Sequence, residues 1–265
     1  MTTQLFLSLA ALVALAPAVL VTLRNPKERD GLFWLLLAGA LMGALARASA
    51  VLTPQWHTGL ADALWLTIAA SLTLFMLIAA LARDAWRLTP LLLPYLGVLG
   101  VLATIWQQAP ERPLVAAPAV WLELHILVSV ATYGLLTVAA VAGLAVLLQE
   151  RALKGKRRGT LSQLLPAIAS CERLQMALLV ASESILGLGL LTGMATEYFV
   201  SGRMLVFDHK TLLSLLAFAV IGALLVVHAR SGIGGRRVAR FVLLAYLLLT
   251  LAYPGVKFVT DVLLA

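Results

Sequence analysis

Long apolar stretches dominate this sequence and constrain what it can fold into. Windows of about 20 apolar residues, the length that a helix needs to cross a bilayer, lie near residues 4–23, 31–52, 60–81, 89–106, 120–149, 175–196, 211–228 and 240–259. With 62% hydrophobic and 12% charged residues, the chain has too little polar surface to coat a soluble globule. The sequence therefore predicts an all-α fold, a polytopic membrane bundle of about eight transmembrane helices that forms one domain over residues 1–265.

The basic residues predict how this bundle is oriented. The turns after the first, third, fifth and seventh windows hold fifteen of the twenty Lys and Arg residues, namely Arg24, Lys27, Arg29, Arg83, Arg87, Arg151, Lys154, Lys156, Arg157, Arg158, Arg173, Arg230, Arg236, Arg237 and Arg240. Because basic turns stay on the cytoplasmic side, both termini are expected outside. Topology also explains the net charge of +8, so binding to nucleic acid is excluded.

Three of the four histidines fall on the predicted outer side. His209 opens the seventh window and His228 closes it 19 positions later, roughly 28 Å away along a helix, so these two cannot share one ligand. His125 lies near the outer end of the fifth window, and His57 lies in an outer turn. Two outward imidazoles on different helices, His125 and His209, suit bis-histidine ligation of a haem iron. Ordinary hydrogen bonding at the headgroup level is the alternative interpretation.

Other residues on this side suit a flat ligand. Arg47, near the outer end of the second window, is a candidate for binding a haem propionate. Four tryptophans also lie toward the outer side: Trp56, Trp65, Trp106 and Trp121. An interfacial aromatic belt explains tryptophans equally well. A ligating imidazole needs an acceptor for its second nitrogen, and Glu123 and Asp208 are the candidates.

Four consecutive stretches carry a family resemblance. They are WLELHILVSVATYGLLTVAAVAGLAVLLQERALKGK (121–156), LPAIASCERL (165–174), SGRMLVFDHKTLLSLLAFAVIGALLVVHAR (201–230) and SGIGGRRVAR (231–240). In this order they resemble the CcsA/ResC-type cytochrome c assembly proteins, which handle haem. The likeness is closest to the short YpjD-like inner-membrane proteins, with the HemX-like proteins related. The resemblance covers approximately residues 118–265, and it implies a multi-pass protein of the bacterial cytoplasmic (inner) membrane.

Position by position, the resemblance implies roles for several residues. His125 falls on the first external haem ligand of the family, and His228 on a membrane histidine associated with an inward-side haem site. Asp208, Lys210 and Gly202 match the Asp, Lys and first Gly of the tryptophan-rich haem-binding signature. Trp121 opens the first matching stretch and is a further candidate for contact with the cofactor.

The chain also departs from the family pattern. The tryptophans of the signature are replaced by Ser201, Leu205 and Phe207, and the second external histidine that normally follows the last span is missing. His209 stands where the signature usually has proline, so its role as a substitute iron ligand is an inference from position.

Two classes of function follow. The first is a haem-handling membrane protein that holds haem b at the outer face, with haem and cytochrome c assembly components as partners. The second is a cofactor-free carrier or regulatory scaffold with the family fold. A third possibility, an ion-coupled transporter, uses Glu183 inside the sixth window. The single cysteine, Cys171, excludes an internal disulfide, and we find no catalytic constellation that predicts an enzyme.

Overall fold

The protein is a bundle of long helices. A computed structural model describes residues 2–23, 30–49, 57–107, 112–113, 119–156 and 159–259. Its elements are α1 (Thr2–Leu23), α2 (Gly31–Ser49), β1 (His57–Thr58), α3 (Leu60–Leu81), the 3-10 turn η1 (Ala85–Leu88), α4 (Thr89–Ile105), β2 (Arg112–Pro113), α5 (Ala119–Lys154), α6 (Thr160–Leu164), α7 (Ile168–Ser201), α8 (His209–Ser231), α9 (Gly235–Thr250), the π-helical turn η2 (Leu251–Gly255) and α10 (Val256–Phe258). Within these ranges, eight helical segments are long and apolar enough to cross a membrane, which confirms the predicted fold class.

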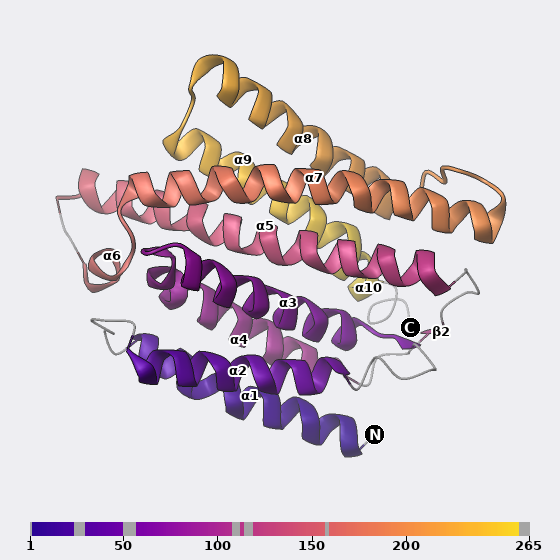
Figure 1. Cartoon of the computed structure of the whole chain (residues 1–265), viewed down its shortest axis with the longest axis horizontal. Helices are drawn as coiled ribbons and strands as arrows, with labels where there is room; N and C mark the ends of the chain where they lie inside the picture. The colour runs from indigo at the N-terminus through magenta and orange to yellow at the C-terminus, as the bar shows by residue number, and fades with distance from the viewer. Residues whose placement is uncertain are drawn as a thin grey trace.

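The helices form two groups that meet at α5 (Figure 1). Helices α1 to α4 pack together on one side, and α7, α8 and α9 lie on the other. Helix α5 packs against α3 from the first group and along α7 and α9 from the second. In its apolar window 78% of the residues are buried, against 17% in α8. The central helix α5 is therefore the element best placed to hold an enclosed site.

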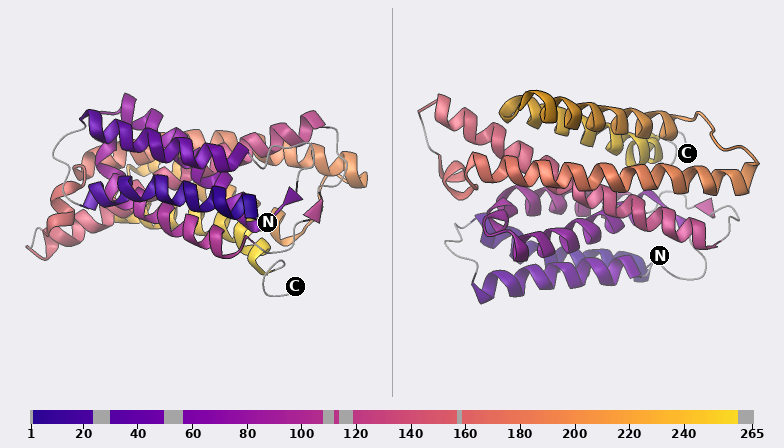
Figure 2. Two further views of the ribbon diagram at one scale, coloured as in Figure 1. Left: turned by 90° about the horizontal axis from the view of Figure 1, so that it is seen from below. Right: turned by 45° about the horizontal axis from the view of Figure 1, so that its top comes forward.

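The start of α1 and the last helix, α10, lie at the same end of the bundle (Figures 1 and 2), as an even number of spans requires. The basic turns lie at the opposite end, which we call the basic end. Five of the basic residues counted above, Arg24, Lys27, Arg29, Arg157 and Arg158, lie outside the described residues. The end that carries the termini is called the terminal end below.

Hydrogen bonds across the basic end fix the start of α9. The carboxylate of Glu172, on α7, accepts a hydrogen bond from the backbone N–H of Gly235 at 2.6 Å. Glu150, on α5, accepts one from the N–H of Arg236 at 3.1 Å. The first N–H groups of a helix have no partner within it, so these two carboxylates satisfy them and tie α9 to both neighbouring helices.

Helices α5 and α7 extend beyond the predicted windows of 120–149 and 175–196. The polar continuation of α5 is held at the basic end, where the amide of Gln149 donates to the carbonyl oxygens of Ser162 at 2.9 Å and Pro166 at 3.1 Å. A hydropathy window detects only the apolar part of a helix. The helix itself extends as far as its backbone hydrogen bonds continue, including into polar sequence.

The last span departs from a regular α-helix near the terminal end. After Thr250 the helix widens into the π-helical turn η2, which contains Pro254. Proline has no N–H for the carbonyl one turn earlier, so a regular α-helical bonding pattern is interrupted here. Single π-helical turns are frequent at functional sites, and this one leads into Lys257, whose side chain is only 8% exposed.

Candidate functional site

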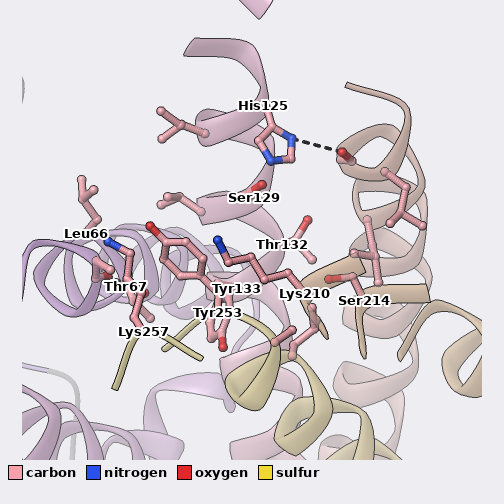
Figure 3. A pocket seen from close by; sticks show the side chains of 18 of the residues that line it. Leu66, Thr67, His125, Ser129, Thr132, Tyr133, Lys210, Ser214, Tyr253 and Lys257 are labelled. Carbon is pink, nitrogen blue, oxygen red and sulfur yellow. Dashed lines mark hydrogen bonds between the residues drawn. The ribbon is translucent and has the colours of Figure 1, made fainter. Parts of the chain in front are cut away.

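A cavity of about 390 Å³ lies at the terminal end of the bundle, between α3, α5, α7, α8 and the end of the last span. Figure 3 shows the side chains that enter it. Most of the wall is apolar, with a few polar side chains from different helices, among them His125, Tyr133, Lys210, Tyr253 and Lys257. Sites for small molecules and cofactors have this composition and volumes of roughly 300–1,000 Å³. We call this space the outer cavity, because the positive-inside rule predicts that the terminal end lies outside.

His125 enters the outer cavity from the second turn of α5. Its Nδ1 lies 3.2 Å from the carbonyl oxygen of Gly189 and 3.2 Å from the hydroxyl oxygen of Thr192, both on α7. A carbonyl oxygen only accepts, so Nδ1 carries the proton and donates it. In the neutral imidazole Nε2 then keeps its lone pair, and Figure 3 shows the ring with its second nitrogen turned toward the cavity. This is the arrangement in which a backbone carbonyl orients an imidazole for ligation to a metal.

The acceptor for this imidazole differs from the sequence-based expectation. We expected Glu123 or Asp208, whereas the structure has the Gly189 carbonyl. Glycines on α7 allow the close approach, because a Cβ at Gly193 would lie 3.0 Å from Cε1 of the His125 ring. The glycines of α7 thus allow the His125 side chain to pack directly against the backbone of that helix.

The N-terminal end of α8 presents a different residue to the outer cavity than the one singled out from the sequence. His209 is the first residue of α8 and is exposed. The lining includes its neighbour Lys210 and does not include His209. Asp208 caps the helix, because its side chain accepts a hydrogen bond from the N–H of Thr211 at 2.8 Å. Partial burial alone would raise the pKa of Asp208, but the hydrogen bonds from Thr211 and the charge of Lys210 outweigh it and lower that pKa below its usual range.

Arg47 is connected to the outer cavity through Asp62. The fully buried guanidinium donates from Nη2 to Asp62 at 2.8 Å and from Nε to the Ser8 hydroxyl at 2.9 Å. Asp62 lines the outer cavity, whereas Arg47 does not. A buried charge is costly unless it is paired, which explains why these two residues are found together. Asp62 is a part of the site that sequence reasoning missed.

The tryptophans do not form one belt. Trp65 is fully buried in the core between α3 and α4, with 0% of its surface exposed. Trp106 packs edge-on against Phe258, and Trp121, 38% exposed, stacks on Phe199 of α7. Trp121 is not among the residues that line the outer cavity. Trp56 and the side chain of His57 lie outside the described part of the chain.

His228 lies at the basic end, at the far end of α8 from the outer cavity. Its Nδ1 is 2.5 Å from the carbonyl oxygen of Ile233, just beyond the C-terminus of α8. His228 and His125 therefore lie at opposite ends of the bundle.

Glu183 lies in the middle of α7, half-buried and facing α8. Its Oε1 is 3.0 Å from the position that a Cβ at Gly222 would take. Glu183 is not among the residues that line the outer cavity. A role for this carboxylate would therefore be separate from that of His125.

The described residues offer no site for a bare metal ion, since none of their His, Cys, Asp and Glu side chains form a group of three or more that could hold one. A haem iron has different requirements. The porphyrin supplies four nitrogen ligands, and the protein needs to supply only axial ones. An oriented imidazole such as His125 in an apolar cavity fits that requirement.

Comparisons with known proteins identify the family of this chain. The profile of the family described as "Cytochrome C assembly protein" matches residues 27–264, so the likeness begins before α2 and includes α2 to α4 as well. The 28.8 kDa protein in the nifR3-like 5′ region of Azospirillum brasilense is 55% identical over 271 residues and covers 100% of both chains. The inner membrane protein YpjD of Escherichia coli K12 is 29% identical over 190 residues, 71% of this chain and 70% of YpjD.

The family match covers most of the chain, and it agrees with the eight apolar helices and with the inner-membrane relative. The protein is a multi-pass protein of the bacterial inner membrane, and it belongs to the cytochrome c assembly protein family.

Proposed function

We propose that this protein binds haem b in the outer cavity, with Nε2 of His125 as an axial ligand of the iron, and that it holds the haem at the outer face of the membrane. Family membership supports a haem-handling role for a membrane protein of this kind. The observation that carries the proposal is the His125 imidazole, whose Nδ1 is held by α7 and whose Nε2 faces an apolar cavity.

The chemistry of the cavity fits this cofactor. Haem bound here would supply a redox-active iron, or would itself be the cargo for cytochrome c assembly partners. The apolar wall excludes water from the macrocycle, and Tyr133 and Tyr253 add aromatic surface. Because Cys171 is the single cysteine, covalent attachment through a pair of neighbouring thiols is not possible, and non-covalent haem b is the form that this chain suits.

The other candidate residues have narrower proposed roles. His209 is not among the residues that line the outer cavity, and its proposed role as the second axial ligand rests on its place beside Lys210 at the start of α8, which Asp208 caps. Arg47 is proposed to influence the bound ligand through Asp62, to which it donates a hydrogen bond. Trp121 is proposed to cover the neighbouring face of α7 by stacking on Phe199. His228, at the basic end, belongs to a separate inward-side step.

A visible spectrum of the purified protein, expressed with adequate haem, tests the proposal. Sharp, split bands on reduction are expected for low-spin haem, and His125→Ala should abolish them. The matched control is Leu127→Ala, which changes a residue of the same helix that is 67% exposed and should leave the spectrum intact. Loss of the second ligand in His209→Ala should convert the spectrum to a high-spin form, and an unchanged spectrum would remove His209 from the site.

The alternative function is a cofactor-free carrier or scaffold, and a specific observation favours it. Ser201, Leu205 and Phe207 replace the tryptophans of the family's haem-binding signature. This alternative predicts a colourless protein, even with ample haem, and the same colourless outcome for wild type, His125→Ala and Leu127→Ala.

A further inference from the structure

We infer that Lys210 and Lys257 form a carboxylate-binding pair in the outer cavity and hold the two propionates of the porphyrin. This inference rests on the haem binding proposed above and concerns the anionic part of that ligand. The lysines come from different elements, Lys210 from the first turn of α8 and Lys257 from α10 at the end of the last span. Both side chains line the same cavity as His125.

Lys257 lies in an unusual position for a lysine. It stands in the outer part of the last span, and its side chain is 8% exposed. Its Nζ lies 5.5 Å from the centre of the Tyr253 ring, another residue of the cavity wall. Charged residues in a membrane span are costly, face the interior or a cavity, and mark ligand pathways. The sequence already indicates this unusual position, because Lys257 is a single lysine inside an apolar run.

Lys210 reaches the same space from the opposite wall. In Figure 3 its side chain runs into the cavity, with its amino nitrogen directed toward Tyr133 and Tyr253. The cap provided by Asp208 fixes the first turn of α8 and with it the direction of the neighbouring lysine. The apolar stem packs along the wall, so the amino group is the polar end presented to a ligand.

The charges of the cavity wall favour an anion. Asp62 is the one carboxylate among the described lining residues, and it is paired at 2.8 Å with the buried guanidinium of Arg47. Its charge is therefore compensated by Arg47, and the two lysines add positive charge to the same wall. An apolar wall with an oriented imidazole and two ammonium groups matches a flat amphiphile that carries a metal and two carboxylates.

Titrations with haemin and with its dimethyl ester, which lacks both free carboxylates, test the lysine pair separately from haem binding. Each would be titrated into the full-length protein in neutral detergent and followed by Soret absorbance. We expect the wild type to bind the diacid about tenfold more tightly than the diester, because charge-assisted hydrogen bonds are the stronger ones. The double variant Lys210→Gln, Lys257→Gln should lose most of that preference. Comparing the ratio in wild type with the ratio in the variant cancels the partition of each porphyrin into detergent.

The control variant is Lys154→Gln, which removes an exposed lysine at the basic end of α5 and should retain the preference. Lys257→Arg should retain it as well, which separates loss of charge from loss of folding. Equal affinity of the wild type for diacid and diester, with a spectrum that still depends on His125, would overturn the lysine pair and leave haem binding intact. Absence of any His125-dependent spectrum with either porphyrin would overturn both.

Discussion

The imidazole of His125 lies directly against Gly193: a Cβ at that glycine would be 3.0 Å from Cε1 of the ring and 3.5 Å from Nδ1. One turn earlier on α7, Gly189 supplies the carbonyl oxygen that accepts from Nδ1. The missing side chain of Gly193 and the carbonyl group of Gly189 act together on the ring. The ring is held against the backbone of α7, so its second nitrogen is oriented before any ligand arrives.

Substitution of Gly193 by alanine tests whether this glycine positions the His125 ring. The added methyl group needs the His125 ring to move by a few tenths of an ångström, which lengthens the bond to Gly189. We expect haem affinity in Gly193→Ala to fall by roughly tenfold, equivalent to about 1.4 kcal/mol, as measured by Soret titration. Gly39→Ala is the control, because a Cβ there meets nothing within 4 Å. Affinity equal to that of the wild type in Gly193→Ala would show that the ring does not depend on the glycine.

The ion pair of Arg47 and Asp62 predicts an asymmetry in stability. Removing one partner leaves the other charge buried, which costs about 3–5 kcal/mol, whereas replacing both by apolar residues is close to neutral. Arg47→Leu should therefore lower the free energy of unfolding strongly, and Arg47→Leu, Asp62→Leu should recover much of the loss. Thermal unfolding in detergent measures both.

Arg230→Leu is the matched control for that experiment, since Arg230 is exposed at the basic end of α8 and its loss should change stability little. A single variant Arg47→Leu as stable as wild type would contradict the pairing. The double variant also tests the outer cavity, because it removes the carboxylate of the wall together with its partner and should leave the preference for the diacid porphyrin in place.

Orientation in the membrane is tested by reporter fusions. The positive-inside rule places the basic end in the cytoplasm and both termini outside. Alkaline phosphatase fused after Ala265 should be active, and the same enzyme fused after Gly232, in the turn between α8 and α9, should be inactive. A cytoplasmic fluorescent protein should give the reverse pattern. An active phosphatase at Gly232 would invert the topology and place the outer cavity at the inner face.

The sequence was sufficient to predict the spans, because a bilayer imposes a length and a composition on any segment that crosses it. Eight apolar windows became eight long helices. Two residues that match the family, His125 and His228, lie at opposite ends of the bundle. Placement along the membrane normal follows from position in the chain alone.

The direction in which each side chain points was decided by the tertiary structure. His209 and Lys210 are neighbours in sequence, yet Lys210 lines the outer cavity and His209 does not. The partners of His125 and Arg47, Gly189 and Asp62, lie on other helices. The apolar side chains of α8 point to all sides of the helix. The sequence therefore contains no hydrophobic stripe that would indicate which face of α8 turns inward. Between membrane helices that choice depends on close packing and interhelical hydrogen bonds, and these exist only once the helices are assembled.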